Sequence, residues 1–202
     1  MKTINTYYSD FDSLKQFVNS NRDVLLASSN SSVLAQVFSG ICSKDLLLEI
    51  SEHIRTLVPG SQVIGATTNG EIMNGLPSGL RIVISFSIFN DAVVRLALLN
   101  KSDDSDFNLG LALGRSLDSS DARVLLVFAT GVTVNASQLL KGIEKANPFL
   151  PVAGGNAGDN LNHIQSFVLA NGEITDRGAA GAVLAGENLL AARHNHLGWQ
   201  SI

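Results

Sequence analysis

Apolar side chains recur at helical spacing in several segments of the chain. The clearest is residues 43–57, where Leu46, Leu47, Ile50, Ile54 and Leu57 fall on one face of a helix. Ser43 is placed to cap this helix, and Pro59-Gly60 ends it. The same spacing predicts helices over residues 10–18, 107–117 and 135–146, the last capped by Asn135 and ended before Pro148.

Short apolar or alternating runs between these helices predict β-strands. The predicted strands cover residues 23–28, 62–67, 81–89, 93–99, 123–128, 151–155, 166–170, 173–175, 178–185 and 189–192. We expect residues 81–89 and 93–99 to pair as a hairpin across Asn90-Asp91. A second hairpin is expected over Asn171-Gly172, because Asn-Gly is strongly favoured in two-residue turns.

The order of these elements repeats along the chain, with pseudo-repeats at about residues 20–100 and 120–190. Val24-Leu25-Leu26 corresponds to Val124-Leu125-Leu126, and residues 63–71 correspond to residues 152–159 with a one-residue gap. Strand–helix–strand units with glycine turns also arise by chance, so an accidental likeness is the alternative. The sequence predicts an α/β fold of two related β-α-β-β-β units, whose mixed sheets are covered by helices. A layered α-β-β-α sandwich is one such arrangement.

Two turns carry the residues best suited to hold a ligand. The residues concerned are Gly65, Thr67, Thr68, Asn69, Gly70 and Glu71 in the first turn, and Gly154, Gly155, Asn156, Gly158 and Asp159 in the second. Glycine lets a ligand approach the main chain, and hydroxyl, amide and carboxylate groups can orient it. We expect the two turns to meet and line one pocket, where Asp159 or Glu71 would accept a ligand ammonium group. The alternative is that the glycines only permit tight turns and the acids cap nearby backbone. Neither turn has the spacing of a nucleotide-binding loop.

Other reactive residues do not form a recognisable catalytic set. His163 follows the second turn and is a candidate haem ligand by its location alone, while His53 is expected to be exposed. His194 and His196 share one face of an extended segment, but two ligands do not make a zinc site. Cys42 has no assignable partner. Glu71 or Asp159 could serve as the general base of a hydrolase, which is an alternative from a different class.

The composition excludes some classes of partner. Hydrophobic residues make up 45% of the 202 residues and charged residues 16%, with a net charge of −4 and no cluster of Lys or Arg. A nucleic-acid-binding protein would show a basic patch, so we expect no such partner. No apolar run approaches the roughly 20 residues that cross a bilayer, and the polar N-terminus has no signal-peptide pattern. With Cys42 as its single cysteine, the chain is expected to be cytoplasmic.

The sequence resembles the FIST family, the sensory domain found near the N-terminus of bacterial signalling proteins. The likeness is carried by residues 124–128 with Gly131, by Pro151–Asp159, by the hairpin 167–173 and by Gly178–Gly186. In the first half, Pro59 and residues 63–72 add to it. Asn156 departs from the family pattern, which usually has a small or hydroxyl residue there.

The resemblance implies an input domain that binds a small molecule, such as an amino acid, and performs no catalysis. It also implies coupling to a histidine kinase, a cyclic-di-GMP enzyme or a chemoreceptor. Some family members are haem-containing nitric oxide sensors, which makes haem the alternative ligand and His163 its candidate contact. A protein-interaction module without a pocket is a further alternative. The family usually has a second, C-terminal domain, so the 202 residues are expected to cover mainly its N-terminal part.

Overall fold

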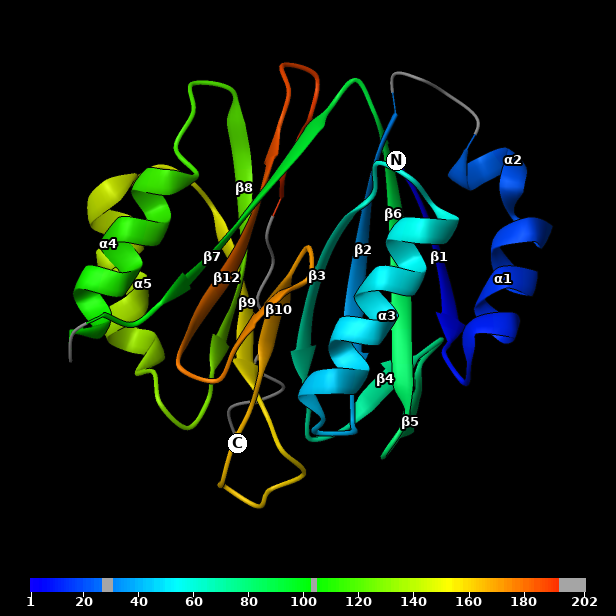
Figure 1. Cartoon of the computed structure of the whole chain (residues 1–202). Helices are drawn as coiled ribbons and strands as arrows, with labels where there is room; N and C mark the ends of the chain where they lie inside the picture. Colours follow the sequence, from blue (N-terminus) through cyan, green and yellow to red (C-terminus); the bar gives the residue numbers. More distant parts are fainter. Residues whose placement is uncertain (27–30, 103–104, 193–202) are drawn as a thin grey trace, which may run out of the picture.

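Two β-sheets pack face to face, and helices cover the outer face of each sheet (Figure 1). This computed structural model describes residues 1–26, 31–102 and 105–192. The helices are α1 (Phe11–Ser20), α2 (Arg22–Leu25), α3 (Lys44–Leu57), α4 (Asp106–Ser116) and α5 (Ala136–Ala146). The predicted α/β class is confirmed, and the layers follow the order α-β-β-α.

The larger sheet has six strands and the smaller has four. The larger sheet has the order β1 (Lys2–Tyr7), β6 (Ile82–Asn90), β2 (Ser31–Ser39), β3 (Gln62–Thr67), β10 (Val168–Ala170) and β11 (Glu173–Thr175). The smaller sheet has the order β7 (Val93–Asn100), β12 (Gly178–Ala185), β8 (Ala122–Thr130) and β9 (Val152–Ala157). A separate hairpin pairs β4 (Glu71–Met73) with β5 (Leu76–Ser78).

The same arrangement of strands occurs twice. The order β1-β6-β2-β3 in the larger sheet matches β7-β12-β8-β9 in the smaller one. In each sheet one pair is parallel, β2 with β3 and β8 with β9, and a helix connects the two strands of the pair. Parallel strands joined in this way bring their carboxyl ends to one edge of the sheet, where α/β proteins commonly bind ligands.

The helix boundaries follow the caps that the sequence suggested. Ser43 Oγ accepts a hydrogen bond from the Leu46 amide at 3.3 Å, and Asn135 Oδ1 accepts one from the Gln138 amide at 3.2 Å. Asp10 forms a reciprocal capping box with Ser13 at the start of α1. Each cap satisfies an amide that the first helical turn leaves unpaired. The predicted helices over residues 10–18, 43–57, 107–117 and 135–146 are confirmed.

The strand predicted at residues 23–28 is wrong over residues 23–26, and residues 27 and 28 lie outside the described residues. The apolar run there forms α2, whose Leu25 is buried in the core under the first sheet. The strand follows as β2, where Ser31, Ser32 and Gln36 interrupt the apolar pattern and obscured it. The true counterpart of β8 is therefore β2, and the match of Val24-Leu25-Leu26 to Val124-Leu125-Leu126 does not hold.

The predicted hairpin across Asn90-Asp91 is also wrong. Its strands, β6 and β7, belong to different sheets, and the turn carries the chain from one sheet to the other. In both strands, successive side chains alternate between the space between the sheets and the space under the helices. That pattern cannot tell a hairpin from a crossover. Three further differences are β1 and the β4–β5 hairpin, neither of which was predicted, and residues 189–192, which form no strand.

Three layers of apolar side chains hold the sandwich together. One lies between the first sheet and α1 and α3, one lies between the sheets, and one lies between the second sheet and α4 and α5. Helices α4 and α5 pack backbone to backbone, because a Cβ on Gly110 would stand 2.0 Å from the Leu139 carbonyl oxygen. None of the helices in the described ranges is long and apolar enough to cross a bilayer.

Candidate functional site

The turns that follow β3 and β9 lie side by side, as predicted. The Gly158 amide donates to the Thr67 carbonyl at 2.8 Å. The Asn69 side chain makes a second connection, because its Oδ1 accepts from the amides of Asp159 at 3.0 Å and Leu161 at 3.1 Å. The carboxyl ends of the two parallel strand pairs therefore meet at one end of the sandwich.

A cavity of about 380 Å³ lies between the two turns. It is lined by Phe38, Ala66, Thr67, Thr68, Asn69, Gly70, Phe128, Gly154, Gly155, Asn156 and Gly158. Both halves of the chain contribute, and the lining combines two aromatic rings with glycine backbone and amide and hydroxyl side chains. Its size falls within the range of roughly 300–1,000 Å³ typical of small-molecule sites. None of the described residues that line the cavity is charged.

Phe38 and Phe128 form the apolar part of this cavity. Phe38 is paired with Ala66 of β3, and Phe128 is paired with Gly155 of β9. Their rings meet edge to face across the two sheets, with centroids 5.6 Å apart. Neither ring was predicted as a site residue. The sequence does mark both rings in the same way. Each Phe directly follows a Val and comes shortly before the glycine just beyond the end of its strand, Gly40 or Gly131.

Most of the predicted ligand-binding residues line the cavity, but three do not. Thr67, Thr68, Asn69, Gly70, Gly154, Gly155, Asn156 and Gly158 are lining residues. Gly65 lies instead within the larger sheet, where a Cβ would stand 3.1 Å from Val37 and 3.4 Å from Leu169. Glu71 and Asp159 are buried and absent from the lining.

Asp159 organises the loop that leads from β9 to β10. Its carboxylate accepts from the amides of His163 at 2.9 Å, Ile164 at 2.6 Å and Gln165 at 3.1 Å. These bonds, led by that of Ile164, lower the pKa of Asp159 below its ordinary value, although partial burial opposes the shift. The carboxylate is thus a backbone cap, and the prediction that it accepts a ligand ammonium group lacks support from its geometry.

Glu71 is used in a similar way. Its carboxylate accepts from the Thr68 hydroxyl and from the Arg81 amide, the latter at 3.1 Å. It also lies against Gly40, where a Cβ would stand 2.6 Å from Glu71 Oε1. Glu71 therefore fixes the start of the β4–β5 hairpin against the end of β2.

The polar groups that remain open to a ligand come mainly from the second turn. In the first turn, Thr67 Oγ1 accepts from the Phe167 amide and Asn69 Oδ1 accepts two amides, so both side chains are engaged. The Asn156 side chain has no hydrogen-bond partner in the described part of the chain and is exposed. Gly155 is also open, because a Cβ there would have no neighbour within 4 Å.

Among the described residues, neither a histidine nor Cys42 lines this cavity. The side chain of His163 is exposed, and no histidine is a lining residue, so the lining does not offer an axial haem ligand. His194 and His196 lie outside the described residues. Within the described ranges, no three His, Cys, Asp or Glu side chains gather as metal ligands would. His53 is half-buried, contrary to expectation, with Nδ1 2.9 Å from the Tyr8 hydroxyl.

The Cys42 thiol belongs to the scaffold near the cavity. It donates to the Gln165 carbonyl at 3.1 Å and so contacts the loop that Asp159 caps. Burial, with a smaller contribution from the nearby Asp159 charge, raises the pKa of this thiol. This environment favours the thiol over the thiolate, which is the nucleophilic form.

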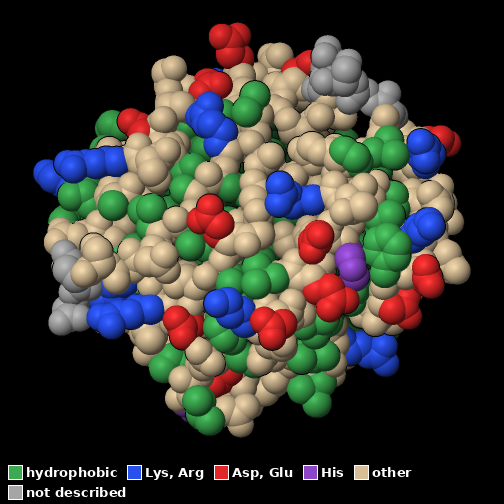
Figure 2. Space-filling model, in the orientation of Figure 1, with side chains coloured by type: hydrophobic (Ala, Val, Ile, Leu, Met, Phe, Trp, Pro, Cys, Tyr) green, Lys and Arg blue, Asp and Glu red, His purple; other side chains and the backbone are tan. Residues whose placement is uncertain are grey.

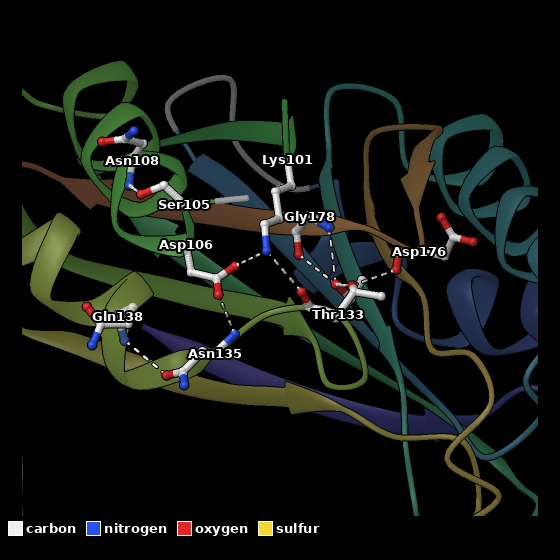
Figure 3. Close-up of polar contacts among 10 residues, drawn as sticks. Lys101, Ser105, Asp106, Asn108, Thr133, Asn135, Gln138, Asp176 and Gly178 are labelled. Atoms are coloured by element: carbon white, nitrogen blue, oxygen red, sulfur yellow. Dashed lines mark hydrogen bonds and ion pairs between the residues drawn. The ribbon is translucent and has the colours of Figure 1, made fainter. Parts of the chain in front are cut away.

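A polar network supports the second sheet at the end where β7 and β8 finish and where α4 and α5 begin (Figure 3). Lys101 Nζ lies 2.9 Å from Asp106 Oδ1, and these side chains are only 9% and 14% exposed. Asp106 Oδ2 accepts from the Asn135 amide, so one carboxylate ties the start of α4 to that of α5. Thr133 continues the network to the Asp176 carbonyl. These bonds are all within the scaffold, so we regard the network as structural.

A second hollow, of about 530 Å³, lies between the C-terminal ends of α4 and α5. It is lined by Asp118, Ser119, Ser120, Ala122, Arg123, Asn147, Phe149 and Leu150, all from the second half of the chain. It is the larger hollow, but it lies at the amino ends of β8 and β9. We favour the smaller cavity because both halves form it at the carboxyl ends of the parallel strands.

Comparison with known proteins agrees with this geometry. The family model for the FIST N domain matches residues 33–202, which include every residue that lines the cavity and leave out β1, α1 and α2. No curated protein matches the chain.

Proposed function

Because the chain belongs to the FIST N domain family, whose members are sensory domains of signal-transduction proteins, we propose that its ligand binds between the turns after β3 and β9. The observation that carries this proposal is the shared cavity, to which both halves contribute a phenylalanine and a turn. An aromatic floor with a few polar groups around it is the usual composition of a small-molecule site.

The lining favours a neutral or zwitterionic ligand about the size of an amino acid. Phe38, Phe128 and Ala66 offer apolar contact, while the side chain of Asn156 offers hydrogen bonds. The described lining residues are all uncharged, so a strongly ionic ligand would lose its hydration there without gaining a counterion from them. An amino acid can place its carboxylate on backbone amides and its ammonium on carbonyl oxygens.

We propose binding rather than catalysis for these residues. A general base needs a free lone pair directed at the substrate. The carboxylates of Glu71 and Asp159 accept hydrogen bonds from the scaffold and lie outside the lining. The hydrolase alternative therefore has no base in this cavity.

The ligand would act by changing the relation between the two turns. Only a few hydrogen bonds join them, among them Gly158 to Thr67 and Asp159 to Asn69. A ligand that contacts both turns favours the arrangement in which they are closed, by as much as its affinity differs between arrangements. A histidine kinase, a cyclic-di-GMP enzyme or a chemoreceptor would detect this change as the output partner.

The test is a thermal-shift screen with the twenty standard amino acids, followed by calorimetric titration of any amino acid that raises the Tm. Bound ligand raises the Tm by mass action. The Gly155→Leu variant places a side chain in open space within the cavity, and Gly79→Leu is its control, because both glycines have no neighbour within 4 Å of a Cβ and only Gly155 is a lining residue.

We expect a stabilising amino acid whose binding is lost in Gly155→Leu and kept in Gly79→Leu. The absence of any stabilising amino acid would refute the ligand class. Equal affinity in both variants would refute the location.

A further inference from the structure

The chain contains two hairpins of the same design, and only one of them, β10–β11, belongs to one of the two large sheets. Both consist of two three-residue strands joined by Asn-Gly, with Asn74-Gly75 in β4–β5 and Asn171-Gly172 in β10–β11. All four turn residues have positive φ, as a two-residue hairpin turn requires. Each hairpin follows the second strand of a parallel pair and precedes the strand that returns to the sheet. They are therefore equivalent elements of the two halves.

The second hairpin crosses to the sheet of the first half. There β10 pairs antiparallel with β3, so that Leu169 lies opposite Gly65 and Ala170 lies opposite Ile64. Leu169 is fully buried as a result. The long connection formed by residues 158–167 makes this crossing possible.

The first hairpin has no such partner among the described residues. It forms a two-stranded sheet of its own, and Ile72, the counterpart of Leu169, is 74% exposed. Leu76 is 69% exposed, and Figure 2 shows hydrophobic side chains on the surface at the lower end of the molecule, where Figure 1 places this hairpin. A two-stranded hairpin has little stability of its own in water.

The edge to which such a hairpin would bind is also open. Aligning Phe38 with Phe128 makes Gly65 of β3 equivalent to Gly154 of β9 and Ile64 equivalent to Ala153. In the described ranges β9 pairs only with β8, and Ala153 to Asn156 are exposed. The strand has no charged residue or proline to protect this edge, although proteins usually protect exposed edges in this way.

The hairpin cannot readily reach the open edge of its own chain. Only Thr68, Asn69 and Gly70 connect β3 to β4, and the buried Glu71 carboxylate fixes the first residue of β4. We propose that two copies of this chain associate by hairpin exchange, with β4 of each copy adding antiparallel to the β9 edge of the other. A second copy is the partner because this chain itself carries the hairpin that matches the edge.

The β10–β3 pairing predicts the register of this exchange. Ile72 lies opposite Gly154, and Met73 lies opposite Ala153 of the other copy. Pro77 lies in β5, which becomes the outermost strand, where a residue without an amide hydrogen is tolerated. When each copy gives its hairpin to the same partner from which it receives one, the two junctions are related by a two-fold axis and the exchange closes as a dimer.

The first experiment is light scattering after size exclusion, on the wild-type chain over a range of concentrations. We expect a dimer whose dissociation constant rises roughly tenfold or more in Ile72→Lys, because the lysine side chain would have to fit where β4 pairs with the β9 edge of the other copy. Phe149→Lys is the matched control, because Phe149 is 92% exposed outside the hairpin and its replacement should leave the dimer unchanged. A chain that stays monomeric throughout, or a dimer that tolerates Ile72→Lys, would overturn the proposal.

The second experiment tests the register in a Cys42→Ser background. One chain carries Met73→Cys and a separate, larger tagged chain carries Ala153→Cys. Cα atoms opposite one another in an antiparallel pair lie within disulfide reach. We expect a mixed disulfide to form on oxidation, and to form much more slowly when Phe149→Cys replaces Ala153→Cys. Equal rates for the two pairs would overturn the register, and an intrachain disulfide in a chain with both substitutions would show that the hairpin binds its own edge.

Discussion

Phe38 and Phe128 hold equivalent positions in the two sheets and meet edge to face, with ring centroids 5.6 Å apart. The pair joins the two halves at the cavity, so it contributes both to the packing between the sheets and to the apolar wall of the proposed ligand site.

This contact predicts energetic coupling between the two rings. An aromatic pair contributes about 0.5–1.5 kcal/mol beyond the area it buries, so Phe38→Leu and Phe128→Leu should be non-additive by that amount. Denaturant unfolding of the wild type, both single variants and the double variant measures the coupling. If the losses in the free energy of unfolding were strictly additive, the two rings would contribute independently and the predicted coupling would be absent.

Gly154 and Gly155 are neighbours, but only the first position requires the absence of a side chain. Gly154 has a φ of +148°, and a Cβ on it would stand 1.8 Å from the Val127 carbonyl oxygen, whereas a Cβ on Gly155 would meet nothing within 4 Å. Gly154→Ala should therefore destabilise the fold, and Gly155→Ala should change the free energy of unfolding by no more than about 0.5 kcal/mol. Thermal and denaturant unfolding of the two variants checks this. Similar losses in both would contradict the backbone geometry of β9.

Asp159 predicts a specific dependence of stability on pH. Its pKa is lowered in the folded chain by the amides it caps, so its contribution is fully present above the ordinary aspartate pKa of about 3.9 and is lost as pH falls through the lower folded value. Asp159→Asn should reduce stability at neutral pH and remove this part of the acid dependence.

The control for that experiment is Asp23→Asn, because Asp23 is exposed on α2. Unfolding curves between neutral pH and about pH 3 compare the three proteins around the aspartate pKa. If Asp159→Asn and the wild type lost stability in parallel over that interval, the capping role would be wrong.

The Lys101–Asp106 pair should matter far more than an exposed ion pair. Lys101→Met leaves the Asp106 carboxylate buried beside α4 and α5 without its cation, a change that typically costs about 3–5 kcal/mol. Arg95→Met is the matched control, because Arg95 and Asp121 are 3.8 Å apart with side chains about two-fifths exposed, and such pairs contribute about 0–1 kcal/mol. Equal effects on the free energy of unfolding would show that the buried pair is solvated.

Local sequence was sufficient for α1, α3, α4 and α5 and for the glycine-rich turns, but not for α2. Ser43 and Asn135 cap α3 and α5 because side-chain oxygens satisfy amides within the same turn, a relation that depends only on neighbouring residues. The register of Gly65 with Gly154 could also be read from the sequence, and the strand pairing of the two sheets agrees with it.

Long-range pairing could not be read in this way. Alternation in β6 and β7 reflects two faces that pack against different layers, and both a hairpin and a crossover between sheets produce that pattern. The acids were misjudged for a related reason. A carboxylate after a glycine suits a ligand or a backbone cap equally well, and only the folded loop shows that three amides occupy Asp159.

The central claim is that one ligand contacts both turns. The most direct measurement is a ¹H–¹⁵N NMR titration of the wild-type chain with the amino acid that most raises its Tm. The account predicts that the amides of residues 68–70 and 154–158 shift together, with one common dissociation constant. Shifts confined to one turn, or centred on residues 118–123 and 147–150 around the larger hollow, would contradict it.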